Sequence, residues 1–127
     1  MIPDAYLDAL EVRPERIAWL EERFAQECVE TFVAMDEELV GMTTVGPSRD
    51  EDRLGVRELY ALYVLPSQWR QGAGSALLEV CGDVELLWVL AANARGRAFY
   101  ERHGFRADGV AKERHFDGPV FEVRYVR

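Results

Sequence analysis

The sequence contains little cysteine. Cys28 and Cys81 are its only two cysteines in 127 residues, they form no CxxC pair, and no histidine lies near either. Disulfide frameworks and zinc sites need several cysteine or histidine ligands at short spacings. We therefore expect neither a disulfide-stapled fold nor a metal.

Long apolar runs are also missing. No apolar segment approaches the ~18 residues that a membrane-spanning helix requires. The N-terminal residues MIPDAYLDALEVRPER are acidic and amphipathic, without the basic start and apolar centre of a signal peptide. We therefore expect a cytoplasmic protein that has no membrane partner.

Basic residues are outnumbered, with 15 Lys and Arg against 23 Asp and Glu and a net charge of −8. Nucleic acids are bound through clustered Lys and Arg, so we expect no nucleic-acid partner. The charge favours a cationic substrate, and solubility explains it equally well. A length of 127 residues, 49% of them hydrophobic, predicts one globular domain over residues 1–127.

The apolar periodicity predicts an α/β chain. Two short helices are expected first, one opened by Pro3 and one after Pro14, the latter with Ile17, Leu20 and Phe24 on its apolar face. The predicted elements that follow are strands 30–35 and 39–45, a charged loop 46–53, a central strand 56–65, a helix 72–81, a strand 84–91, a helix 94–103, and strands 105–116 and 119–126. This order indicates one mixed sheet with helices packed on it.

A glycine-rich turn, Arg70 to Ser75, joins the central strand to the next helix. The first N–H groups of a helix are unpaired and carry the positive end of the helix dipole, so they form an anion site. Gly72 and Gly74 would let a phosphate approach these donors. No Lys-Ser/Thr follows and Leu77 stands at the third glycine position, so the turn is neither a P-loop nor a dinucleotide motif. A purely structural turn is equally compatible.

A second motif begins at Asn93, at the end of a predicted buried strand. Tyr100 lies seven residues later, two helical turns along nearly the same face. An amide and a phenol aligned in this way suit an extended ligand beside the helix. Each residue taken alone also has a structural interpretation. Asn93 suits the N-cap of the helix, Tyr100 suits the core, and Gly104 suits the left-handed position just past the helix end.

Together the two motifs, ELYALYVLPSQWRQGAGSALL and then LWVLAANARGRAFYERHGF, resemble the acetyl-CoA motifs of the GNAT superfamily of N-acetyltransferases. The resemblance continues through FEVRYVR and covers roughly residues 28–127. It implies an α/β (α+β) fold: a mixed, mostly antiparallel sheet flanked by helices, with splayed central parallel strands. It also implies acetyl-CoA as cosubstrate and direct transfer of the acetyl group to a primary amine of a small molecule or a protein N-terminus.

The resemblance implies a role for individual residues. The backbone of Leu62, Tyr63 and Val64 would contact the pantetheine and acetyl group. Asn93 would hydrogen-bond the pantetheine arm, and Tyr100 would protonate the departing thiolate. The residues that would surround the pyrophosphate are Arg70, Gln71, Gly72, Ala73, Gly74 and Ser75.

Acetyl transfer also needs a neutral amine. A lysine-like amine, with a pKa of ~10.4, is about 4.6 kcal/mol from neutrality at pH 7, a cost that a base helps to remove. Glu58 opens the central strand beside the expected cleft and is the candidate base, directly or through water. A solvated strand-end carboxylate is an equally valid interpretation. Cys81 is expected in the core rather than as a nucleophile.

Some features depart from the family pattern. Trp69 stands where Gln or Arg is usual, and Gly96 where Ala is common. From the resemblance we expect the usual first strand and first helix to be missing in front of Ile2, and the helix at 72–81 to be short. A shortened domain with exposed sheet edges favours a homodimer.

Two alternatives stay open. A non-catalytic acyl-CoA-binding or sensor module of the same fold is favoured by the missing N-terminal elements and opposed by Asn93 and Tyr100. The string FYERHGF also resembles repeats of glyoxalase-like metalloenzymes and bleomycin-resistance-like proteins. Those need His and Glu ligands across paired units, whereas His103 and His115 are the only histidines here.

Overall fold

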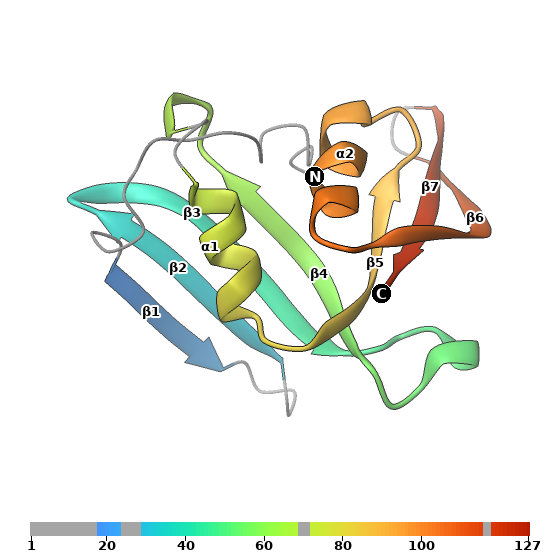
Figure 1. The fold of residues 1–127 in the computed structure, drawn as a ribbon, viewed down its shortest axis with the longest axis horizontal. Helices are drawn as coiled ribbons and strands as arrows, with labels where there is room; N and C mark the ends of the chain where they lie inside the picture. Colours follow the sequence, from blue (N-terminus) through green and yellow to red (C-terminus); the bar gives the residue numbers. More distant parts are fainter. Residues whose placement is uncertain (1–17, 24–28, 69–71, 116–117) are drawn as a thin grey trace.

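The computed structural model describes residues 18–23, 29–68, 72–115 and 118–127. These residues form a seven-stranded mixed sheet with two α-helices on one face (Figure 1). The strands are β1 (Ala18–Arg23), β2 (Glu30–Asp36), β3 (Glu38–Pro47), β4 (Arg57–Val64), β5 (Val84–Leu90), β6 (Arg106–His115) and β7 (Pro119–Val126). The helices are α1 (Ala73–Val80) and α2 (Ala94–Arg102), and two 3-10 turns are η3 (Glu51–Arg53) and η4 (Pro66–Gln68).

The strands run in the order β1-β2-β3-β4-β5-β7-β6, and only β4 and β5 are parallel. Their pairing covers Arg57↔Val84, Glu58↔Leu86 and Leu59↔Leu87 and then ends, although both strands continue. In Figure 1 the two strands meet at one end and diverge toward the other. The expected sheet with splayed central parallel strands is therefore confirmed.

A β-bulge lies beside the point where β4 leaves β5. Thr44 pairs with Ala61 and Val45 with Leu59, so Tyr60 is an extra residue in β4. A bulge bends and twists the strand that carries it. The bulge at Tyr60 is thus the local feature that turns β4 away from β5.

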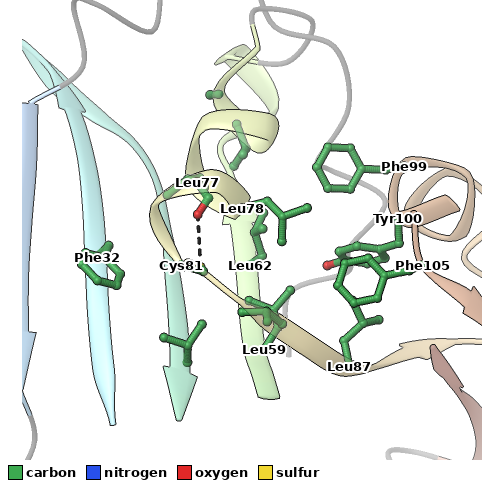
Figure 2. Packing of buried hydrophobic residues seen from close by; sticks show 14 of the residues in the cluster. Phe32, Leu59, Leu62, Leu77, Leu78, Cys81, Leu87, Phe99, Tyr100 and Phe105 are labelled. Atoms are coloured by element: carbon green, nitrogen blue, oxygen red, sulfur yellow. Dashed lines mark hydrogen bonds between the residues drawn. The ribbon is translucent and has the colours of Figure 1, made fainter. Parts of the chain in front are cut away.

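The main core lies between the sheet and the two helices (Figure 2). It is built from alternate residues of the central strands and from one face of each helix. Its members include Leu59, Leu62, Leu77, Leu78, Leu87, Phe99, Tyr100, Phe105 and Tyr125. Burying each such side chain contributes about 1.5–3 kcal/mol, which holds both helices on the same face of the sheet.

Cys81 belongs to this core, as predicted. Its thiol donates to the carbonyl of Leu77 at 3.1 Å and lies 3.2 Å from Oγ1 of Thr43. Burial raises the pKa of the Cys81 thiol, which disfavours the thiolate that a nucleophile needs. The residue therefore packs rather than reacts.

The helix predicted after Pro14 is wrong in the part that the structure describes. Residues 18–23 form β1, which pairs antiparallel with β2 from Ala18↔Met35 to Arg23↔Glu30. Backbone pairing with the edge of β2 overrides a helical period that rested on three apolar residues. Ile17 and Phe24, and the helix expected near Pro3, lie outside the described residues. A strand thus precedes the hairpin where a helix was expected.

Both ends of α2 follow the predicted pattern. Asn93 caps α2, its side-chain oxygen accepting from the N–H of Gly96 at 3.0 Å, and Gly104 follows the helix at φ 91°. Gly72 precedes α1 in the left-handed region, at φ 81°. Among the described residues, α1 and α2 are too short to cross a bilayer, with 8 and 9 residues.

Candidate active site

A cavity of about 410 Å³ lies where β4 and β5 diverge. Leu59, Leu62 and Tyr100 line it from the helix side. The cavity is also lined by Glu58, Trp88 and Glu122. Each of these residues neighbours a core residue in its own strand, so its side chain lies on the sheet face opposite the helices. The cavity is therefore lined by residues from both faces of the sheet.

Tyr100 is held in the wall of this cavity by other aromatic rings. Its side chain is 2% exposed, and its ring packs edge-on against Phe99, at 5.2 Å between centroids, and Phe105, at 5.9 Å. In Figure 2 the hydroxyl end of the ring points from α2 toward β4. The packing thus fixes a phenol at the edge of the gap between the strands.

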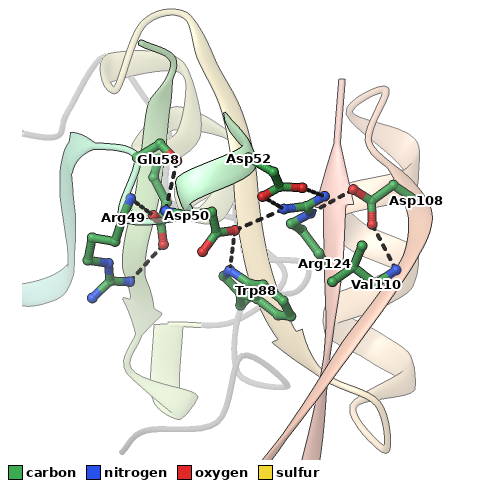
Figure 3. A network of polar contacts seen from close by, with 9 residues as sticks. Arg49, Asp50, Asp52, Glu58, Trp88, Asp108, Val110 and Arg124 are labelled. Carbon is green, nitrogen blue, oxygen red and sulfur yellow. Dashed lines mark hydrogen bonds and ion pairs between the residues drawn. The ribbon is translucent and has the colours of Figure 1, made fainter. Parts of the chain in front are cut away.

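Glu58 is buried on the face opposite the helices. Its side chain is 1% exposed. The backbone N–H of Arg49 donates to Oε1 at 2.9 Å, and the Arg49 guanidinium donates to Oε2 at 2.7 Å (Figure 3). A buried carboxylate needs such partners, because an unpaired buried charge is costly. Glu58 is therefore not the solvated strand-end carboxylate of the alternative interpretation.

Arg49 closes this side of the cavity. Its guanidinium lies 4.0 Å from the centroid of the Tyr60 ring, a cation–π contact. Burial acts to lower the pKa of Arg49, and the hydrogen bond and charge of Glu58 outweigh it, so the pKa is raised. The bulged residue Tyr60 thus supports the arginine that pairs with Glu58.

A second ion pair lines the cavity from β7 and β6. Glu122 is buried, and one of its carboxylate oxygens lies 2.6 Å from Nε of Arg114. Between the two ion pairs stands Trp88 of β5, with Nζ of Lys112 3.9 Å from the centroid of its ring. This face of the cavity is therefore charged and aromatic, whereas the helix side is apolar.

The loop that carries Arg49 is tied down by Arg124, a buried residue of β7 (Figure 3). Arg124 pairs with Asp52 through two bonds of 2.7 and 2.8 Å, with Asp108 at 2.6 Å and with Asp50 at 3.3 Å. The hydrogen bond to Asp52 is the largest cause that raises the pKa of Arg124. Asp50 also accepts from Nε1 of Trp88 at 3.0 Å. The network joins the β3–β4 loop to the C-terminal strands.

The glycine turn lies at the start of α1, apart from the residues that line the cavity. The first helical bond runs from the N–H of Ala76 to the carbonyl of Gly72 at 3.1 Å. The N–H groups of Ala73, Gly74 and Ser75 precede it, and in a helix start these have no intrahelical partner. Oγ of Ser75 lies 3.0 Å from Nε2 of His103. Arg70 and Gln71 lie outside the described residues.

Asn93 carries a buried donor that has no partner in the part of the chain that the structure describes. The residue is 7% exposed, and Nδ2 has no hydrogen-bond acceptor among the described residues. Because Oδ1 accepts from Gly96, the orientation of the amide is fixed and Nδ2 is the end that stays unpaired. Leaving a buried donor unpaired costs about 1–3 kcal/mol. The site thus fits a ligand that offers a carbonyl oxygen.

Of the residues predicted from sequence, Glu58, Leu62, Tyr63 and Tyr100 line the cavity together. Val64, the last residue of β4, and Asn93, the N-cap of α2, are outside its lining.

Sequence reasoning missed several charged and aromatic residues of the cavity: Arg49, Tyr60, Trp88, Arg114 and Glu122. Glu122 alternates with apolar residues in β7, which was a usable signal for the face it occupies. Its partner Arg114 lies on the adjacent strand of the β6–β7 hairpin, where Lys112 pairs with Glu122, so the register of that hairpin was a signal for the partner too.

Comparison with known proteins agrees with this geometry. Residues 27–107 match the acetyltransferase (GNAT) domain family. The chain is 34% identical over 107 residues to the Bacillus subtilis protein named uncharacterized N-acetyltransferase YuaI, covering 83% of this chain and 51% of that protein. The chain spans about half the length, or less, of the curated relatives it matches.

Solved structures share the fold. A GNAT-family acetyltransferase from Desulfovibrio desulfuricans superposes with a TM-score of 0.61 at 19% identity, over 86% of this chain and 96% of that one. Arabidopsis thaliana NAA60, solved in complex with acetyl-CoA, gives a TM-score of 0.60 at 17% identity, over 80% and 77%. With its splayed β4 and β5, its cavity between them and its matched domain, the chain belongs to the GNAT acetyltransferase family.

Proposed function

We propose that this protein transfers the acetyl group of acetyl-CoA to a primary amine by direct attack, without a covalent enzyme intermediate. The observation that carries the proposal is the cavity itself. It crosses the sheet between β4 and β5 and brings Tyr100 from one face and Glu58 from the other to the same space. A thioester entering from the helix side and an amine entering from the charged side would meet there.

Acetyl-CoA would be held on the helix side. The first N–H groups of α1, from Ala73 to Ser75, would bind the pyrophosphate, with Arg70 and Gln71 beside them. The unpaired Nδ2 of Asn93 would donate to an amide carbonyl of the pantetheine arm. The β4 backbone from Leu62 to Val64 would pair with that arm as an added strand does. NAA60, which shares the fold, was solved with acetyl-CoA bound.

The chemistry needs one base and one acid. Glu58, directly or through water, would take the proton of the ammonium, and the neutral nitrogen would then attack the thioester carbon. Backbone N–H groups near Tyr63 and Val64 would stabilise the oxyanion. As the C–N bond forms and the C–S bond breaks, the nitrogen would release its second proton to water and Tyr100 would protonate the thiolate. Glu58 would then lose its proton to solvent, and Tyr100 would regain one from it. Arg49 must share Glu58 with the incoming ammonium.

The test combines binding with turnover. Calorimetry with acetyl-CoA and a thiol-release assay over a panel of amines should show binding, and release of CoA that depends on the amine. Binding without amine-dependent release would instead identify a non-catalytic acyl-CoA-binding module. Absence of acetyl-CoA binding would contradict the proposal altogether.

A further inference from the structure

The charges on the open face of the cavity are ordered by depth. The carboxylates are deep, the side chains of Glu58 and Glu122 being 1% and 7% exposed. The guanidiniums that pair with them lie outside, Arg49 at 56% and Arg114 at 43% exposed. A molecule that enters from this face meets positive charge first and negative charge last.

Three cations gather at this mouth: Arg49, Lys112 and Arg114, here called the basic rim. Burial against Trp88 lowers the pKa of Lys112 first, and the charges of Arg114 and Arg49 lower it further, while Glu122 and Asp50 act to raise it. The cations are thus close enough to repel one another, in a chain whose net charge is −8. Concentrating like charges around a cavity favours an anionic ligand group.

The phosphates of CoA are not suited to be that group. The basic rim lies around Glu58, Trp88 and Glu122, on the face opposite the helices, whereas the anion site proposed for the pyrophosphate is at the start of α1. The anion that the rim fits must therefore come with the other substrate.

Arg114 has the hydrogen-bond donors needed to bind an anionic group of the second substrate. A guanidinium presents five N–H donors in a plane that matches a carboxylate. The contact with Glu122 is made by Nε of Arg114, and 43% of the arginine side chain stays exposed to an incoming ligand. Arg49, by contrast, is already engaged by Glu58 and by the Tyr60 ring.

We propose that the acceptor is a small amino carboxylate, whose amine lies between Glu58 and Glu122 and whose carboxylate is bound by Arg114 at the basic rim. The proposal deepens the acetyltransferase function and rests on it. A cavity of about 410 Å³ suits a small molecule. The depth order of the charges makes the amine enter first, toward the thioester, with the carboxylate behind it.

The experiment uses matched acceptor pairs with the full chain. The kcat/KM for lysine is compared with that for cadaverine, and phenylalanine with phenethylamine, each pair differing by one carboxylate. We expect the wild type to favour the amino acid by roughly 10- to 100-fold, the range for a charge-assisted hydrogen bond. Arg114→Gln should abolish that preference by raising KM for the amino acid, with little change for the amine.

Two further variants complete the design. Arg114→Lys keeps the charge but loses the planar fork, so it should retain part of the preference. Arg53→Gln, an arginine of η3 outside the cavity lining, should leave the preference intact. Thermal melts of each variant check that the fold is kept.

Equal use of both members of each pair by the wild type, or better use of the decarboxylated amines, would overturn the amino-carboxylate inference. So would an equal loss for both members in Arg114→Gln. In either case amine-dependent release of CoA would persist and the acetyltransferase proposal would stand. Absence of acetyl-CoA binding, or of release with every amine, would overturn both.

Discussion

Tyr100 and Glu58 come from opposite faces of the sheet and line the same cavity. The relationship exists because β4 pairs with β5 only as far as Leu59 and then bends at the bulge of Tyr60. In a fully paired sheet, side chains on opposite faces are separated by the backbone. The splay is therefore what brings the proposed acid, Tyr100, and the proposed base, Glu58, to one cavity.

Replacing Tyr100 with Phe should separate chemistry from binding. The ring and its contacts with Phe99 and Phe105 are kept, so the Kd for acetyl-CoA should hardly change. The lost proton donor should lower kcat roughly ten- to a thousand-fold. Stopped assays at saturating amine and calorimetry with acetyl-CoA measure the two quantities.

Tyr125→Phe is the matched control. Tyr125 is a buried tyrosine outside the cavity lining, whose hydroxyl donates to Glu101 at 2.6 Å. Removing this hydroxyl should lower the stability of the fold and leave kcat unchanged. Wild-type turnover in Tyr100→Phe would mean that the phenol only packs.

Asn93 allows the cap and the donor to be tested apart. Asn93→Asp keeps an oxygen for the N–H of Gly96 and removes the unpaired Nδ2 donors. We expect stability without ligand to be kept, since Asp is a good N-cap, and affinity for acetyl-CoA to fall by roughly ten-fold, as expected for one lost hydrogen bond.

Asn93→Ala removes both functions. It should also lose about 1 kcal/mol of stability with the cap. Thermal melts of one sample with and without acetyl-CoA give both the stability of the free protein and its stabilisation by the ligand. Equal affinity for acetyl-CoA in the wild type and in Asn93→Asp would limit Asn93 to capping.

The sequence predicted the parts of this site that local rules govern. The cap by Asn93, the left-handed Gly104 and the buried central strand each follow from neighbours in the chain. Residues 18–23 escaped prediction because their conformation is decided by pairing with β2. The partner of Glu58 escaped for a similar reason, since it depends on the placing of the β3–β4 loop. Glu122 differs, because its partner Arg114 lies on the other strand of the predicted β6–β7 hairpin and only the register of that hairpin was needed to find it.

Arg124 should stabilise the fold through the loop that it holds. Arg124→Met removes the common partner of Asp50, Asp52 and Asp108 and leaves their charges close together. Removing one member of a buried ionic network costs about 3–5 kcal/mol, and we expect the lower end here because Asp52 is exposed. Urea unfolding measures the loss.

Asp52→Asn provides the comparison. Arg124 would keep Asp50 and Asp108, so stability should change little. A free energy of unfolding in Arg124→Met equal to that of the wild type would show that the network is not needed to hold the loop.

Glu58→Gln tests the base, and its signature is a pH dependence of the rate. With the side chain of lysine as acceptor, whose pKa is ~10.4, most of the amine is charged at neutral pH and needs the base. The variant should therefore lose most activity near pH 7 and recover part of it at high pH, where more amine is already neutral. With an acceptor whose pKa is ~7.7, the variant should lose less activity, because water can take the proton of that amine.

Glu85→Gln is the control. Glu85 is an exposed residue of β5, so this variant should follow the wild-type pH profile at every pH. If Glu58→Gln keeps the wild-type pH profile with the strongly basic acceptor, the carboxylate is not the base, and its ion pair with Arg49 serves only to hold the cavity wall.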